Sequence, residues 1–222
     1  MIHTQSITKS YKEPAICKKE ILRYAGCKIN DATTLALIDA CIDEVRDKLT
    51  YKVCYQRLPL TIRENVCDFG TFSVESKDLT KNLSGCEEII LFAATIGIEI
   101  DRQITKYSHI SPTKALLFQA IGAERIESLC DAFCKDIASE YGLHTRPRYS
   151  AGYGDVPLDI QTEIFRQLSA TKQIGVTLNS SLLMSPSKSV TAFVGLTQED
   201  IQYNESKCMM CNRKDCAYKG DL

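Results

Sequence analysis

The feature that most constrains the fold is one long helical pattern near the middle of the chain, "SPTKALLFQAIGAERIESLCDAFCKDIASEYG". Its Ser-Pro start is favourable, because proline fits the first turn of a helix, and a glycine marks its end. The sequence therefore predicts a helix from about Pro112 to Tyr141. This helix should be the longest element of the protein.

The residues before it predict two helices and then strands. A short helix should follow Pro14 and stop at Gly26, and a longer one should be capped by Asn30 or Asp31. The apolar residues of the longer helix recur at helical spacing: Leu35, Ile38, Cys41, Ile42, Val45 and Leu49. The period then changes, so that "YKVCYQRLPLTI" and "TFSVES" indicate strands near a turn at Gly70. "EEIILFAATIG" is a continuous apolar run typical of a buried strand.

The segment after the long helix, "RPRYSAGYGD" from Arg146 to Asp155, is too polar for a strand and too rich in glycine for a helix. We interpret it as a loop. "PLDIQTEIFRQLSA" predicts a further short helix, and "GVTLNSSLLMSPSKSVTAFVGL" predicts a hairpin or meander. Mixed blocks of helix and strand in 222 residues without an internal repeat predict one α+β domain.

The charge balance and the distribution of apolar residues exclude some classes of function. The 27 basic and 28 acidic side chains give a formal charge of -1, which argues against a nucleic-acid binder and favours small-molecule or protein partners. No apolar run reaches the roughly 18 residues that span a bilayer, and the N-terminus lacks the apolar centre of a signal peptide. We therefore expect a cytoplasmic protein with no membrane partner.

The eleven cysteines are an odd number, and most fall at apolar positions of periodic segments, which argues against a disulfide framework. Cys17, Cys41, Cys130 and Cys134 are predicted to be reduced core residues. A different group lies in the polar tail: Cys208, Cys211 and Cys216. Three thiolates can ligate zinc or an iron–sulfur cluster, although a fourth ligand is missing locally. A redox or docking role, or a disordered or packed tail, is the alternative.

The loop offers groups that suit a carboxylate or phosphate next to a planar ring. These are the guanidinium of Arg146 or Arg148, the hydroxyls of Ser150 and Tyr153, and backbone amides near Gly152 and Gly154. The alternative is a glycine-rich turn whose arginines pair with surface acids. Neither the glycine spacing nor the order of elements fits a P-loop or a Rossmann fingerprint.

The loop resembles the S-adenosylmethionine-binding segment of the activation domain of cobalamin-dependent methionine synthase, whose pattern is Arg-Pro-Ala-Pro-Gly-Tyr. Aligning the Gly-Tyr pairs places Arg148 on the family arginine and Ser150 on the alanine. The same alignment places Gly152 on the glycine and Tyr153 on the tyrosine. The continuation "GYGDVPL" is similar to small stand-alone members of the family.

Two further stretches resemble the family in the same order, so the resemblance covers roughly residues 85 to 196. "DAFCKDI" places Asp131 on a ligand-binding glutamate, and Glu127 lies one turn earlier on the same helical face, so either carboxylate could serve. "MSPSKSVTAF" resembles a family strand region, with four residues in register: Met184, Pro186, Ser189 and Val190. In this alignment, Val194 takes the place of a family tyrosine that contacts the ligand. The resemblance therefore implies that one wall of the binding site differs from that of the family.

The resemblance implies a single domain, residues 1–203, with a mostly antiparallel sheet flanked by helices. Residues 1–84 would form its helical and strand N-terminal part, and residues 85–196 would carry the motifs. Residues 204–222 would form a cysteine-rich tail.

The resemblance also implies that the chain binds S-adenosylmethionine and supports reductive methylation of cob(II)alamin. Arginine would hold the ligand carboxylate, and a helix carboxylate would hold its ammonium. The chain is too short for its own corrinoid module, so we expect a corrinoid partner, such as a methionine synthase lacking this domain, and an electron donor. No catalytic residue is predicted, because the histidines His3, His109 and His144 are dispersed.

Two other functions remain open at this point. One is an independent S-adenosylmethionine-dependent methyltransferase acting on a small molecule. The other is a metal or interaction module built on the cysteine tail. If the cysteines of that tail held an iron–sulfur cluster, the cluster would suggest local electron delivery to cobalt.

Overall fold

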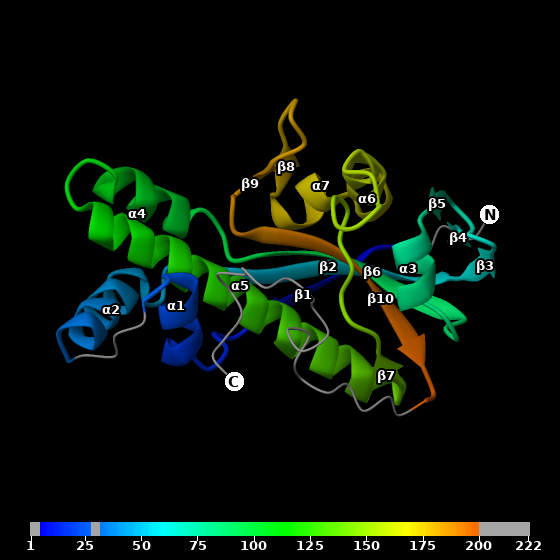
Figure 1. Ribbon diagram of the computed structural model, residues 1–222, viewed down its shortest axis with the longest axis horizontal. Helices are drawn as coiled ribbons and strands as arrows, with labels where there is room; N and C mark the ends of the chain where they lie inside the picture. The colour runs from blue at the N-terminus through cyan, green and yellow to red at the C-terminus, as the bar shows by residue number, and fades with distance from the viewer. Residues whose placement is uncertain (1–4, 28–31, 200–222) are drawn as a thin grey trace.

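A central antiparallel sheet organises the chain in the computed structural model, which describes residues 5–27 and 32–199. Its strand order is β1-β2-β6-β10-β7, and every neighbouring pair is antiparallel. The strands are β1 (Ile7–Tyr11), β2 (Tyr51–Pro59), β6 (Glu88–Thr95), β7 (His144–Thr145) and β10 (Ser189–Thr197). Helices cover both faces of this sheet (Figure 1), which confirms the α+β prediction.

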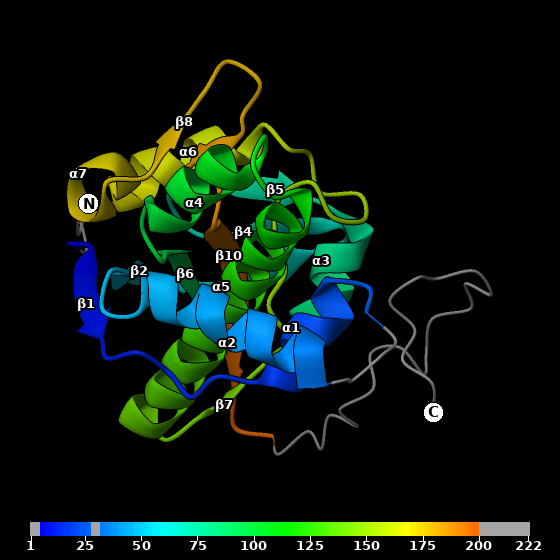
Figure 2. The ribbon, with the colours of Figure 1, turned by 90° about the vertical axis from the view of Figure 1, so that its left-hand side faces the viewer.

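One face of the sheet is covered by four helices. They are α1 (Lys18–Tyr24), α2 (Ala32–Val45), α4 (Glu99–Tyr107) and α5 (Pro112–Tyr141). Figure 2 shows α1 and α2 beside α5. The main core lies here, where Phe118, Leu129 and Phe133 of α5 pack with sheet residues such as Phe92 and Val194.

The opposite face has its own core of buried apolar residues, among them Leu91 and Phe193 of the central strands. A small antiparallel sheet lies on this side: β3 (Thr61–Arg63), β4 (Val66–Asp68) and β5 (Ser73–Glu75). The remaining elements are α3 (Lys77–Asn82), α6 (Ile160–Leu168), α7 (Ala170–Ile174), β8 (Thr177–Leu178) and β9 (Met184–Ser185). Because the strands carry apolar residues on both faces, two helical layers can bury them.

The long helix α5 has the predicted bounds. The Ser111 hydroxyl accepts a hydrogen bond from the Lys114 amide at 3.4 Å, and Pro112 occupies the first turn. Gly142 ends the helix in the left-handed conformation, with φ of 62°. The short helix α1 before Gly26, the buried strand β6 and the β8–β9 hairpin also confirm the sequence predictions.

Other boundaries were wrong or incomplete. The segment predicted as one strand, "YKVCYQRLPLTI", divides at Leu60, whose amide bonds the Glu87 carbonyl at 2.8 Å. Strand β4 and helices α3 and α4 were not predicted, and Leu49 lies beyond the end of α2. The capping candidates Asn30 and Asp31 lie outside the described residues.

The cysteine prediction holds for three of its four residues. Cys41 and Cys130 are buried, Cys134 is half-buried, and all described cysteines are free. Cys17 is exposed, so its assignment to the core was wrong. Its backbone amide, at the N-cap of α1, bonds Glu124 at 3.0 Å, which leaves the thiol at the surface.

A buried ion pair on α5 fixes the chain that precedes α1. Arg125 and Glu124 are 1% and 2% exposed, and Arg125 Nε donates to Glu124 Oε2 at 2.5 Å. Arg125 also donates to the carbonyls of Pro14 and Ala15 at 2.6 and 2.8 Å. This arrangement satisfies both buried charges and holds α1 against α5.

No helix in the described part of the chain is both long and apolar enough to cross a membrane.

Candidate functional site

The site begins with the pairing of the Arg146–Asp155 loop to β10. The amide of Arg146 donates to the carbonyl of Gly195 at 2.8 Å, and Tyr149 and Phe193 exchange two backbone bonds. Side chains alternate along extended chain, so Arg148 faces α5 while Tyr149 packs in the opposite core. The sheet register therefore directs Arg148 toward the predicted helix residues.

Arg148 joins both carboxylates that the sequence marked on α5. Its Nη2 lies 2.5 Å from Glu127 Oε2, and its Nη1 lies 2.5 Å from Asp131 Oδ1. We call these three residues the charged triad. The side chains of Arg148, Glu127 and Asp131 are 21%, 44% and 61% exposed, so the triad is open to solvent on its acidic side.

The electrostatics of this region keep the arginine charged and the nearby thiols protonated. Burial opposes the charge of Arg148, but the carboxylates of Asp131 and Glu127 outweigh burial and raise its pKa. Burial raises the pKa of Cys130 and of Cys134, and Arg148 offsets only part of that effect. Neither thiol is thus prepared to act as a thiolate nucleophile at neutral pH.

The end of the loop is anchored to α3 by Asp155. Its carboxylate accepts the Ser76 hydroxyl and the amides of Lys77 and Asp78, the latter two at 2.8 and 3.3 Å. These bonds, the one from Ser76 first, lower the pKa of Asp155. A carboxylate at a helix N-terminus satisfies free amides and complements the helix dipole.

The glycines of the loop allow a compact turn. Gly152 has φ of 84°, and its amide donates to the carbonyl of Val156 at 3.0 Å. Gly154 has φ of 54°, and a Cβ there would overlap the hydroxyl of Tyr149 and the carboxylate of Asp78. Both positions therefore favour glycine, chiefly through their positive φ.

The structure does not bring every predicted site residue to the triad. Tyr153 is 69% exposed, and Ser150 is half-buried, with its carbonyl accepting the Tyr153 amide at 3.2 Å. Within residues 5–27 and 32–199, no hydrogen bond joins either side chain to the triad. Ser150, Gly152 and Tyr153 thus form a neighbouring turn rather than part of the triad.

Arg146 and Val194, which the sequence also related to the site, have other roles in the structure. Arg146 Nη2 donates to the carbonyl of Ser84 at 2.6 Å, so this arginine ties the loop to the end of α3. Val194 is 1% exposed and packs in the core between β10 and α5. The residue that replaces the family tyrosine is therefore a core residue here.

The sequence did not predict that side chains of α1 contribute to the surroundings of the charged triad. Helix α1 packs against α5, and burial raises the pKa of its Tyr24, with a further rise from the negative charge of Glu127. The Arg23 guanidinium lies 4.2 Å from the centre of the Tyr24 ring and bonds Glu20 at 2.6 Å. No local pattern could reveal this, because the position of α1 depends on its packing against α5.

The remaining candidates within residues 5–27 and 32–199 supply no second centre. His109 and His144 are exposed and dispersed, and no cluster that could hold a metal occurs among the residues that the structure describes. His3, Cys208, Cys211 and Cys216 lie outside those residues.

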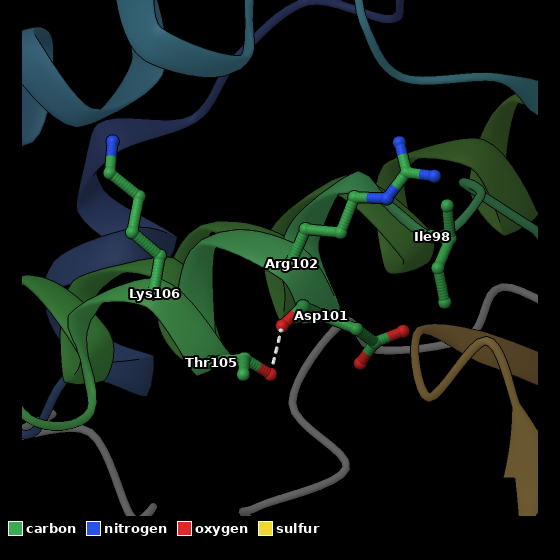
Figure 3. Close-up of a pocket in the computed structure, with 5 residues that line it drawn as sticks. All are labelled: Ile98, Asp101, Arg102, Thr105 and Lys106. Carbon is green, nitrogen blue, oxygen red and sulfur yellow. Dashed lines mark hydrogen bonds between the residues drawn. The ribbon is translucent and has the colours of Figure 1, made fainter.

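A shallow pocket lies along α4, away from every predicted site residue. Figure 3 shows its lining: Ile98, Asp101, Arg102, Thr105 and Lys106. The backbone carbonyl of Asp101 accepts the Thr105 hydroxyl at 2.9 Å, and its carboxylate accepts the Ser187 amide at 2.9 Å. Because its lining comes from α4 and the residue before it, the pocket offers little enclosure for a ligand.

The comparisons with known proteins support the fold. No family model matches the chain, and no curated protein matches its sequence. One solved structure that is similar is described as the crystal structure of the MetH reactivation domain bound to AdoHcy. It is 13% identical, with a TM-score of 0.65, and the match covers 89% of this chain and 80% of that one. The chain therefore has the fold of that reactivation domain.

Proposed function

We propose that this chain binds S-adenosylmethionine at the charged triad and supports the reductive methylation of cob(II)alamin held by a separate corrinoid protein. That partner would be a methionine synthase lacking an activation domain or another corrinoid methyl carrier. The observation that carries the proposal is the pairing of Arg148 with Glu127 and Asp131, in a fold also found in a domain solved with AdoHcy.

The triad suits the amino-acid head of the ligand. A guanidinium has more N–H donors than its two bonds to Glu127 and Asp131 use, so Arg148 can also bind the ligand carboxylate. The carboxylates next to it can hold the ligand ammonium. Because Arg148 already lies between them, both charges of the head would meet their partners with little rearrangement.

The neighbouring turn suits the remainder of the ligand. Glycine at 152 and 154 lets main chain approach an adenosine closely, and the exposed ring of Tyr153 is free to lie against a planar or cationic group. These residues would fix the orientation of the ligand beside the triad. Their role is binding and positioning.

The chemistry would come from the ligand and the partner. S-adenosylmethionine supplies a methyl group to cob(I), which an electron donor generates from cob(II) on the partner. The thiols beside the triad, Cys130 and Cys134, are not prepared as nucleophiles, and the two described histidines are dispersed. The contribution of the chain is therefore to hold the methyl donor in a productive geometry.

The test is the formation of methyl-cob(III)alamin, followed by absorbance. A cob(II)alamin-loaded partner, a reductant, S-adenosylmethionine and this chain are mixed together and with each component omitted in turn. We expect methyl-cobalt only in the complete mixture, and little in a mixture made with Arg148→Met. Equal formation without this chain would contradict the proposal. Methylation of a small molecule at enzymatic rates without corrinoid would favour an independent methyltransferase.

A further inference from the structure

The triad carries more negative than positive charge. It combines the carboxylates of Glu127 and Asp131 with the single guanidinium of Arg148. On the neighbouring helix α1, Arg23 and Glu20 pair with each other at 2.6 Å and cancel. The phenol of Tyr24 is neutral, because burial and the charge of Glu127 raise its pKa. Within the triad itself the surplus is one negative charge.

A free amino-acid head does not balance that surplus, because its carboxylate and ammonium cancel each other. A sulfonium adds one positive charge and does balance it. The two ligands of this class differ in that respect: S-adenosylmethionine has the sulfonium, whereas S-adenosylhomocysteine has a neutral thioether. The charge of the site is therefore complementary to the methyl donor and not to its product.

The two carboxylates occupy different places around Arg148. Asp131 bonds Nη1 and is the more exposed, at 61%, whereas Glu127 bonds Nη2 and is 44% exposed. They are one helical turn apart, about 6 Å along α5. A ligand whose carboxylate lies on Arg148 can thus place its ammonium at one acid and its sulfur at the other. The less exposed acid suits the sulfonium, since its field is less screened by water.

From this arrangement we infer that Glu127 is a specificity-determining residue that distinguishes S-adenosylmethionine from S-adenosylhomocysteine by the charge on sulfur. The inference rests on the proposed function and adds the discrimination between donor and product. When the methyl group leaves, the carbon–sulfur bond breaks, its electron pair stays on sulfur, and the cobalt nucleophile bonds the methyl carbon. The ligand then loses its positive charge, so Glu127 would favour release of the product.

The size of the effect follows from the exposure of the site. The acidic side of the triad is open to solvent, and an exposed ion pair is worth about 1 kcal/mol at most, which is about fivefold in affinity. We therefore expect the intact protein to bind S-adenosylmethionine about fivefold more tightly than S-adenosylhomocysteine. Higher ionic strength should reduce this ratio.

The experiment measures dissociation constants by isothermal titration calorimetry for three ligands. They are S-adenosylmethionine, S-adenosylhomocysteine and sinefungin, in which a protonated amine carries the positive charge in place of the methylsulfonium. The proteins are the wild type, Glu127→Gln, Asp131→Asn and Glu163→Gln. Glu163 pairs with Arg166 on α6, on the other side of the sheet, so its variant controls for a change in net charge. Circular dichroism melts confirm that each variant is folded.

Glu127→Gln should lower the affinity for the two cationic ligands, S-adenosylmethionine and sinefungin, about fivefold. It should change the affinity for S-adenosylhomocysteine by less than twofold, so that the protein no longer distinguishes donor from product. Asp131→Asn should weaken all three ligands alike, and Glu163→Gln should change none. Equal affinities of the wild type for donor and product, or equal weakening of both by Glu127→Gln, would overturn the inference while leaving the proposed function intact. If the wild type bound none of the ligands, the proposed function itself would fail.

Discussion

Arg148 and Asp131, 17 residues apart in sequence, meet through an ion pair of 2.5 Å between Nη1 and Oδ1. The pair depends on the backbone bonds between Tyr149 and Phe193, which set the register of the loop against β10. A shift of one residue would turn Arg148 toward the opposite core. The geometry of the site is thus a property of the loop register as much as of the side chains.

The close approach of Gly154 can be tested by adding a methyl group. Gly154→Ala would place a Cβ against the ends of the Tyr149 and Asp78 side chains at a positive φ, so both ends would have to shift and we expect the free energy of unfolding to fall by about 2 kcal/mol. Gly142→Ala is the matched control, because Gly142 has a similar φ and no atom near its missing Cβ. It should cost about 1 kcal/mol. Equal urea midpoints for the two variants would contradict the close approach.

The anchoring of the loop by Asp155 predicts a pH-dependent stability. Hydrogen bonds from Ser76, Lys77 and Asp78 lower the pKa of Asp155 in the folded state. This contribution is therefore present above the pKa of the unfolded chain, about 3.9, and is lost as the pH falls through the folded value.

The measurement is urea unfolding of wild type and Asp155→Asn between pH 7 and pH 2. The difference in stability between the two proteins should be largest near neutral pH and should shrink on acidification. Asp159→Asn is the control, since Asp159 makes no capping bond to α6. A difference that stays constant with pH would show that Asp155 does not act as a charged anchor.

The buried pair Arg125–Glu124 is expected to determine stability. Arg125→Met would leave Glu124 as an unpaired buried charge and free the carbonyls of Pro14 and Ala15, at a cost of about 3–5 kcal/mol. Adding Glu124→Gln should restore part of that loss. Arg23→Met, which removes a partly exposed pair, should change stability by about 1 kcal/mol or less. Chemical denaturation of the wild type and these three variants measures their free energies of unfolding. If Arg125→Met and Arg23→Met lowered the free energy of unfolding by similar amounts, the buried pair would not determine stability.

Much of the fold could be predicted because its signals are local. The bounds of α5 follow from Ser111, Pro112 and Gly142, and β6 follows from its continuous apolar run. Helix α4 escaped prediction because few of its residues are apolar, and it is stabilised by packing against α5. The break at Leu60 depends on a bond to Glu87, which lies far away in sequence.

The structure brings together three of the residues that the sequence proposed for the site, Arg148, Glu127 and Asp131, and their role in binding stays a prediction. They came from the loop composition and a resemblance, but their mutual pairing depends on where the loop meets β10 and α5. The contribution of Tyr24 could not be predicted, because the buried Arg125–Glu124 pair that positions α1 has no local sequence signature. Local patterns therefore identified the side chains, and tertiary contacts determined their arrangement.

The most direct test of the account is calorimetric titration of S-adenosylmethionine into the wild type, Arg148→Met and Arg166→Met. Arg166 forms an exposed ion pair on α6 and is the matched control for loss of a guanidinium. We predict that the wild type and Arg166→Met bind with the same affinity, and that Arg148→Met binds at least about 30-fold more weakly, a loss of about 2 kcal/mol or more. The absence of binding to the wild type, or equal affinity for Arg148→Met, would contradict the assignment of the ligand to the charged triad.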